Sequence, residues 1–272
     1  MLLGIVTVLS ALLAALICVG VSGGILAYAL GFVGSFLALA ALAFGFFYVM
    51  CQLINPKKPQ EKDSRFYRNL AHLYVDAIIS VARVKIKTQG MDQMPKDGRF
   101  LLVCNHRDNI DPAFLLTCFR KKQLAFISKR EVQEMFLVGK LMHKLLCQPI
   151  NRENDREALK TILKCIRILE EDKASIAVFP EGYIYDDRKL HHFRPGVFKI
   201  ATKTKVPIVV CTLRGTNEAL PKAMRLKPSE VEVRLLSVIY PEEYENLTTV
   251  ELSDKIYEQM AADLGPELVS EG

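Results

Sequence analysis

The chain has 272 residues, of which 50% are hydrophobic, and its formal net charge is +6. This length suits one domain with a full core plus apolar sequence that a soluble fold would not need. The basic residues are interleaved with acidic ones and no nucleic-acid motif is present, so nucleic acid is not an expected partner. The positive charge instead favours an anionic membrane surface, a phosphorylated ligand or an acidic carrier protein.

Residues 1–56 contain no Asp, Glu, Lys or Arg, so every charged side chain lies from Lys57 onward. A helix that spans a bilayer needs about 20 mainly apolar residues, and this segment is long enough for two. We predict the two helices over Leu2–Val19 and Ile25–Leu53, with a glycine-rich turn at 20–24. The N-terminus is therefore expected to form a hydrophobic hairpin, either transmembrane or re-entrant.

Basic residues follow the hairpin at once, and their placement favours the cytoplasmic side of a membrane. They are Lys57, Lys58, Lys62, Arg65 and Arg68. Residues 1–56 are thus predicted as a membrane hairpin and residues 57–272 as a domain on the cytoplasmic face of the cell membrane. A cleaved signal peptide fits poorly, because no basic residue precedes the first apolar run and a second run follows it. A hairpin buried inside a globular core stays open as an alternative.

The seven cysteines are odd in number and show neither a C-x-x-C pair nor a metal-ligand spacing. They are Cys18, Cys51, Cys104, Cys118, Cys147, Cys165 and Cys211. Their pattern suits a reducing compartment, and most are expected to be small buried apolar residues. His191-His192 is too short a signal for a metal site. We predict no metal and no resident cofactor.

After a polar linker at 55–59, apolar residues recur at helical spacing from Phe66 to Ile78. This pattern predicts an amphipathic helix that lies near the membrane surface or packs on the domain. From Val84 the apolar residues alternate with basic ones, which is typical of a half-exposed strand.

Short apolar runs of the buried-strand type then alternate with helical patterns. Strands are predicted over 100–104, 124–128, 175–179, 207–213 and 231–240. Helices are predicted over 112–120, 131–146, 155–171 and 195–204, and a capping box of Thr248 and Glu251 opens a last helix that ends at 264. The alternation predicts an α/β fold with a mainly parallel sheet flanked by helices. In such a sheet, ligands bind at the carboxyl ends of the strands.

The loop after the strand 100–104 contains the strongest catalytic candidates. His106 ends the strand, while Asp111 suits the N-cap of the next helix and Pro112 its first position. On one continuous helix the two side chains would lie about 140° apart, so they can meet only if the loop folds back. A histidine oriented by a carboxylate is a general base for a hydroxyl proton. For these two residues alone, a helix cap beside a polar strand end remains an equal alternative.

Asn105-His106 with Asp111 resembles the N-H-x4-D motif of the lysophosphatidate and glycerolipid acyltransferase family. Three later blocks resemble the family in the same order: P-I-N-R at 149–152, F-P-E-G at 179–182 and V-P-I-V at 206–209. The similarity covers about 100–216. One short motif would be weak evidence, but four in order are specific.

The resemblance implies that His106 and Asp111 deprotonate an acceptor hydroxyl, which attacks an acyl thioester without an acyl-enzyme. It also implies acyl-CoA or acyl carrier protein as co-substrate, and 1-acylglycerol 3-phosphate as the lipid acceptor that becomes phosphatidic acid. The sequence contains no G-x-S-x-G nucleophile elbow. Cys104 is a less favoured alternative nucleophile, because a buried strand cysteine explains it better.

Four residues of the matching blocks are predicted to bind substrate: Asn105, Arg152, Glu181 and Gly182. The resemblance implies that Arg152 binds the acceptor phosphate, which a guanidinium suits. It implies that Glu181 helps to bind or position the acceptor. A surface arginine and a solvated loop acid are the alternatives for these two.

The sequence departs from the family after Glu-Gly, where Tyr183-Ile184 stands in place of Thr-Arg. One expected phosphate-binding arginine is therefore missing, and Arg188 or Arg194 is predicted to replace it. Arg194 precedes the helix predicted over 195–204, whose N-terminus would also favour an anion. The departure leaves open the alternative of an acyltransferase for another lysolipid acceptor. A non-catalytic membrane lipid-binding protein is a further alternative, against which the intact His106–Asp111 pair speaks.

Overall fold

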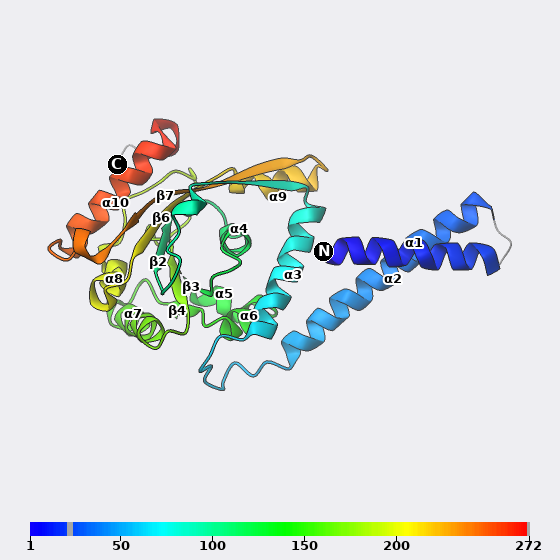
Figure 1. The fold of residues 1–272 in the computed structure, drawn as a ribbon, viewed down its shortest axis with the longest axis horizontal. Coiled ribbons are helices and arrows are strands. Elements are labelled where there is room, and N and C mark those ends of the chain that lie inside the picture. Colours follow the sequence, from blue (N-terminus) through cyan, green and yellow to red (C-terminus); the bar gives the residue numbers. More distant parts are fainter. Residues whose placement is uncertain (21–23, 271–272) are drawn as a thin grey trace.

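A computed structural model of the chain describes residues 1–20 and 24–270. Within these residues, seven strands form one sheet in the order β1-β7-β6-β2-β5-β3-β4 (Figure 1). The strands are β1 (Val84–Gln89), β2 (Leu101–Cys104), β3 (Leu124–Lys129), β4 (Gln148–Ile150), β5 (Ser175–Val178), β6 (Ile208–Arg214) and β7 (Ser229–Ile239). β2 to β6 run parallel to one another, β7 is antiparallel to β6, and β1 is parallel to β7. The predicted α/β fold with a mainly parallel sheet is confirmed.

Helices cover both faces of the sheet (Figure 1). They are α3 (Arg65–Val81), α4 (Asp111–Cys118), α5 (Arg130–Glu134), α6 (Val138–Lys144), α7 (Asp155–Glu170), α8 (Lys199–Thr204), α9 (Thr216–Met224) and α10 (Thr249–Leu264), with short 3-10 helices η1 (Met91–Gln93), η2 (Pro195–Phe198), η3 (Pro241–Glu243) and η4 (Pro266–Leu268). Leu101 and Val103 of β2 face a core with α7, α8 and α10. Leu102 and Cys104 face a second core with α3, α4 and α9. β2 is therefore buried on both sides, which explains its continuous apolar sequence.

Helices α1 (Leu2–Gly20) and α2 (Ile25–Gln52) form the hairpin that the charge-free segment predicts. The helices approach closely where Gly31 lies against Ala14, and Ser35 Oγ donates a hydrogen bond to the carbonyl of Ser10 at 3.1 Å. Both are long and apolar enough to cross a membrane. The predicted turn lies largely at 21–23, outside the described residues.

α3 joins the hairpin to the domain. Tyr67 Oη donates to the carbonyl of Met50 at 3.0 Å, and Tyr74 Oη donates to the carbonyl of Ala43. The Tyr74 ring also lies 4.4 Å from the ring of Phe47. The amphipathic helix predicted from Phe66 to Ile78 is therefore confirmed, and one of its faces packs on α2.

The helix predicted over 131–146 is wrong, because the chain forms α5 and α6 with a break between them. At the break the chain turns sharply and brings Gly139 against the carbonyl of Gln133. A Cβ on Gly139 would lie 1.9 Å from that oxygen, so only glycine fits. The apolar spacing continues through Met135, Phe136 and Leu137 and does not reveal the turn.

Three other elements differ from the predictions. The helix predicted over 195–204 is divided into η2 and α8. β4 was not predicted from the residue pattern, and it is only three residues long. α9 was also missed, because a nine-residue helix with Pro221 in its interior has a weak helical signal.

A buried ion pair fixes the linker and α3 to the sheet. Arg68 Nε donates to Asp63 Oδ2 at 2.8 Å, and the two side chains are 6% and 2% exposed. Arg68 Nη2 also donates to the carbonyl of Leu124 in β3 at 3.0 Å. The pair therefore holds the chain that leaves α2 against a central part of the domain.

Asp63→Asn should lower the free energy of unfolding by about 3 kcal/mol or more, because it leaves the Arg68 charge buried and unpaired. Asp76→Asn is the matched control, since Asp76 pairs with the half-exposed Arg120. That change should cost less than about 1 kcal/mol. Denaturant unfolding in detergent measures both, and equal losses would contradict the role of the buried pair.

Candidate active site

The loop between β2 and α4 folds back on itself and brings His106 to Asp111. Asp111 is fully buried, and its Oδ2 lies 2.8 Å from Nδ1 of His106. The same oxygen accepts the backbone N–H groups of Arg107 at 2.7 Å and Asp108 at 2.9 Å. Three donors thus converge on one carboxylate oxygen, which holds the loop and the imidazole in one arrangement.

Asp111 does not cap α4, contrary to the prediction. Ile110 occupies the N-cap position without a side-chain hydrogen bond, and Asp111 is the first helical residue, followed by Pro112. The carboxylate turns back toward the loop because the N–H groups of Arg107 and Asp108 point at it. Its contacts therefore organise His106 and the loop instead of the helix end.

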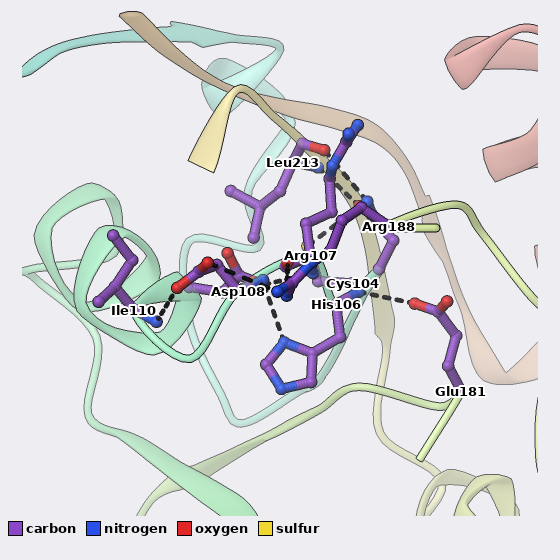
Figure 2. A network of polar contacts seen from close by, with 10 residues as sticks. Cys104, His106, Arg107, Asp108, Ile110, Glu181, Arg188 and Leu213 are labelled. Atoms are coloured by element: carbon purple, nitrogen blue, oxygen red, sulfur yellow. Dashed lines mark hydrogen bonds and ion pairs between the residues drawn. The ribbon is translucent and has the colours of Figure 1, made fainter. Parts of the chain in front are cut away.

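The imidazole of His106 has one occupied and one free nitrogen. Because Nδ1–H donates to Asp111, Nε2 carries the lone pair, and it has no hydrogen-bond partner within the described residues. The ring stacks on Phe179, with centroids 4.0 Å apart and planes inclined by 13°. Figure 2 shows the imidazole extending away from Leu213 and Arg188. The geometry suits a histidine that accepts a proton at Nε2.

Asn105 anchors the start of this loop to β6. Its Nδ2 donates to the carbonyl of Leu213 at 3.1 Å, and its Oδ1 accepts the N–H of Leu213 at 2.7 Å. The side chain is 2% exposed, so its contacts position the loop, while its predicted role toward substrate stays a prediction. Neighbouring Cys104 is also buried, and burial raises the pKa of its thiol well above the ordinary value. This disfavours Cys104 as a thiolate nucleophile.

Glu181 connects the His106 loop to the segment that follows β5. Its Oε1 accepts the backbone N–H of His106 at 2.6 Å, as Figure 2 shows, and its Oε2 accepts the N–H of His191 at 3.0 Å. The side chain is 1% exposed. Burial raises the pKa of Glu181 to about 8, although the two backbone donors act in the opposite direction. Both oxygens are engaged with backbone, so this carboxyl group positions the loop.

Arg188 lies in the segment that follows β5, and its contacts are with the His106 loop. Its Nη1 donates to the carbonyl of Arg107 at 2.8 Å, and it approaches Asp108 at 4.0 Å. Nearby, Leu190 forms a parallel bridge with Val269, so the C-terminal segment supports this part of the chain. Of the two predicted replacements for the missing arginine, Arg188 contacts the catalytic loop.

Arg194 is the replacement that lies beside Arg152. The guanidinium carbons of Arg152 and Arg194 lie 5.1 and 5.0 Å from the centroid of the Tyr183 ring. Arg194 Nη1 also donates to the carbonyl of Arg152 at 3.2 Å. Gly182 has a φ of +82°, and a Cβ there would lie 3.1 Å from Arg194, so glycine provides room for this side chain.

The carboxylates of Glu131 and Asp155 lie in the surroundings of the two arginines without pairing with them. Neither arginine forms an ion pair within residues 1–20 and 24–270. Burial lowers the pKa of Arg152 and the charge of Arg194 acts in the same direction, while Tyr183 and Glu131 act in the opposite one. The two guanidinium groups lack a direct carboxylate partner within the described residues, so an anion would stabilise them.

A cavity of about 600 Å³ opens beside this pair. Its wall is mainly apolar and includes Phe179, whose ring stacks on His106. The charged and polar positions are Arg152, Asp155, Arg194 and Lys199. The apolar side chains are Ile127, Ile150, Ala158, Leu159, Ile162, Val178, Phe193 and Val197. The cavity therefore combines an apolar surface with a cationic rim next to the candidate base.

The helix predicted to start after Arg194 begins with the four-residue 3-10 helix η2 and continues directly into α8. Anion binding at its N-terminus stays a prediction. No group of three or more His, Cys, Asp and Glu side chains suited to a metal occurs within the described residues.

Two aromatic residues of the site were missed by sequence reasoning. Phe179 belongs to the F-P-E-G block, but only the folded chain shows that it stacks on His106. The sequence shows Tyr183 as a departure from the family, but not its contact with two arginines. The only sequence signal for the contact of Tyr183 with arginines is an aromatic residue directly after Glu-Gly, and that signal is weak.

The fold places the His106–Asp111 pair at the carboxyl edge of an α/β sheet, in a geometry that suits a general base. A family model described as Acyltransferase matches residues 85–214. This segment therefore resembles an acyltransferase domain.

Relatives and a solved structure agree with this family. A 1-acyl-sn-glycerol-3-phosphate acyltransferase of Chlamydomonas reinhardtii is 30% identical over 217 residues, which make up 75% of this chain and 61% of that protein. A protein of the same name from Cocos nucifera is 30% identical over 178 residues, or 64% of this chain and 58% of that protein. The chain thus spans less than two thirds of these relatives.

The crystal structure of the LPA acyltransferase PlsC from Thermotoga maritima has the same fold. It matches with a TM-score of 0.64 and 22% identity, over 82% of this chain and 87% of that one.

Asp111→Asn should keep the fold and reduce kcat by about 10²–10⁴-fold, because the amide oxygen still accepts the loop N–H groups but cannot stabilise an imidazolium by charge. His106→Ala should lose at least as much. The chain offers a matched control in the exposed pair of His191 and Asp187. Asp187→Asn should retain most of the turnover. An Asp111→Asn protein with wild-type turnover would exclude a catalytic role for the carboxylate.

Glu181→Gln should change how stability depends on pH. The pKa of Glu181 is raised from about 4.3 in an unfolded chain to about 8 in the fold. Its stabilising contribution is therefore full below pH 4.3 and is lost as the pH rises through 8. The melting temperature of the wild type should fall relative to that of Glu181→Gln between pH 5 and about 8. A constant difference over that range would show that Glu181 is ionised throughout.

Proposed function

We propose that this protein is a membrane-associated O-acyltransferase that moves a fatty acyl group from acyl-CoA or acyl carrier protein to the free hydroxyl of 1-acylglycerol 3-phosphate. The product would be phosphatidic acid, a precursor of phospholipids. The observation that carries the proposal is the hydrogen bond of His106 Nδ1 to the buried Asp111, which leaves Nε2 free as a base. The names of the relatives support this choice of acceptor.

The chemistry follows from that arrangement. Nε2 of His106 takes the proton of the acceptor hydroxyl as the hydroxyl oxygen attacks the thioester carbonyl carbon. The new C–O bond forms, the C–S bond breaks, and the leaving thiolate takes the proton from the imidazolium. Asp111 stabilises the imidazolium while it exists and holds the ring in one tautomer. No acyl-enzyme is needed, which is consistent with the burial of Cys104.

Arg152 and Arg194 are the proposed ligands of the acceptor phosphate. Two guanidinium groups without carboxylate partners suit a dianionic group, which each can bind through two parallel hydrogen bonds. The Tyr183 ring keeps both side chains in place by cation–π contact. The family has an arginine where this chain has Ile184. Arg194 would take over the role of that arginine.

The hairpin α1–α2 is the proposed membrane anchor, with the domain on the cytoplasmic face. Both helices have the length and composition of membrane spans, and their outer surfaces are largely exposed in the fold. The basic residues from Lys57 onward support the orientation.

The proposal is tested with purified protein, one acyl thioester and a panel of lysolipid acceptors with and without an exposed phosphate. Arg152→Gln and Arg194→Gln should each raise the KM for 1-acylglycerol 3-phosphate by about 10–100-fold, since each removes a charge-assisted contact. Tyr183→Leu should raise it less, through the loss of cation–π contact. The KM for the thioester should stay constant.

Arg188→Gln is the matched control, because Arg188 contacts the His106 loop instead of the Tyr183 ring. The fold-decrease in kcat should be larger than the fold-increase in the KM for 1-acylglycerol 3-phosphate. Preferred use of an acceptor without phosphate, unaffected by Arg152→Gln, would support the alternative of another lysolipid acceptor. Absence of transfer to every acceptor, with binding retained, would support a lipid-binding protein.

A further inference from the structure

One face of α3 continues past the hairpin as an exposed apolar surface. Tyr67, Tyr74, Ile78 and Val81 are separated by seven, four and three residues, which places them on the same side of the helix. The two tyrosines donate hydrogen bonds to backbone carbonyls of α2. Ile78 and Val81 lie beyond that contact and are 67% and 66% exposed. The face that holds the hairpin is thus only partly covered by it.

α9 and the turn after it extend this surface. Leu220, Met224 and Leu226 are 55%, 79% and 81% exposed. Leu226 has a φ of 55°, a costly conformation for a bulky residue, and its carbonyl accepts a hydrogen bond from Arg83 Nη1 at 3.1 Å. Because Arg83 follows Val81 by two residues, this hydrogen bond links the end of α3 to the turn after α9.

Basic residues surround these apolar side chains. Lys222 is paired with Glu218 on the same helix. Arg83, Arg225 and Lys227 are exposed, and none of them forms an ion pair within the described ranges 1–20 and 24–270. Exposed apolar side chains bordered by free basic groups are typical of a surface that enters the interface of an anionic bilayer.

We propose that this surface is a second membrane contact, separate from the hairpin, that docks the domain on anionic lipid headgroups. We call it the α3–α9 surface, formed by Ile78, Val81, Leu220, Met224 and Leu226 with the basic residues Arg83, Arg225 and Lys227. Its continuity with the hairpin favours lipid as the partner, because a bilayer that receives α1 and α2 must meet the side of the domain from which they project (Figure 1). The apolar side chains enter the headgroup region and the basic ones bind phosphate or carboxylate groups there.

This inference rests on the membrane anchoring proposed above, but not on the reaction. A docked α3–α9 surface would attach the domain to the bilayer at a second place, in addition to the contacts of α3 with α2. It would therefore keep one orientation of the catalytic loop toward the lipid that carries the acceptor.

The absence of tryptophan from the chain permits a direct test. Leu226→Trp places the sole indole on the α3–α9 surface of the full-length protein, reconstituted in vesicles of phosphatidylcholine and phosphatidylglycerol. Its emission should shift to the blue and be quenched by lipids brominated in their acyl chains. Leu163→Trp is the matched control, since Leu163 is 53% exposed on α7, at the end of the domain away from the hairpin (Figure 1). That indole should stay unquenched.

Neutralising the basic residues tests the choice of partner. In the Leu226→Trp background, Arg225→Gln and Lys227→Gln should each lower the ratio of docked to undocked domain about fivefold. Met224→Trp serves as a second reporter if Leu226→Trp lowers the melting temperature.

Three results would overturn the proposal. In the first, the protein floats with the vesicles, which shows anchoring by the hairpin, but the indoles of Leu226→Trp and Met224→Trp both remain unquenched. In the second, the blue shift depends on protein concentration without lipid, which indicates a second copy. In the third, the shift requires acyl carrier protein, which indicates that this surface binds the acidic carrier.

Discussion

The burial of the Asp111 carboxylate is the constraint on which the site depends. A fully buried charge is tolerated only where donors compensate the lost hydration. Here all three donors meet Oδ2, while Oδ1 is buried without a partner in the described part of the chain. Two of these donors are backbone N–H groups of the loop, so the loop must fold back for the charge to be stabilised. The third donor is the imidazole, whose orientation is therefore fixed by the same requirement.

Glu181 links the His106 loop to segments that are distant in the sequence. Its two oxygens tie the backbone of His106 to that of His191, 85 residues later. Next to His191, Leu190 exchanges backbone hydrogen bonds with Leu268 and Ser270 of the C-terminal segment. The base is thus held by backbone contacts from three parts of the chain. Backbone donors have little conformational freedom, so this arrangement positions the imidazole with smaller entropy losses than long side chains would need.

The sequence predicted the parts of the molecule that depend on local patterns. The buried strands and the His106–Asp111 pair follow from apolar runs and from a strand that leads through a loop into a helix. Features that depend on contacts distant in sequence were not predictable. The break at Gly139 depends on the carbonyl of Gln133, and the role of Asp111 depends on where the N–H groups of the loop point. The antiparallel β7 likewise requires knowledge of its neighbour β6, which the local apolar alternation does not contain.

The charges of the site fall into two groups that differ in how they are balanced. The carboxyl groups of Asp111 and Glu181 accept five hydrogen bonds from the protein, so their oxygens are largely engaged within the fold. Arg152 and Arg194 both contact the Tyr183 ring, and neither forms an ion pair with a carboxylate in the described chain. Binding an anion there removes the repulsion between two cations as well as forming new contacts. A neutral acceptor would leave that repulsion in place, so under the proposed function the two arginines would discriminate between acceptors by charge.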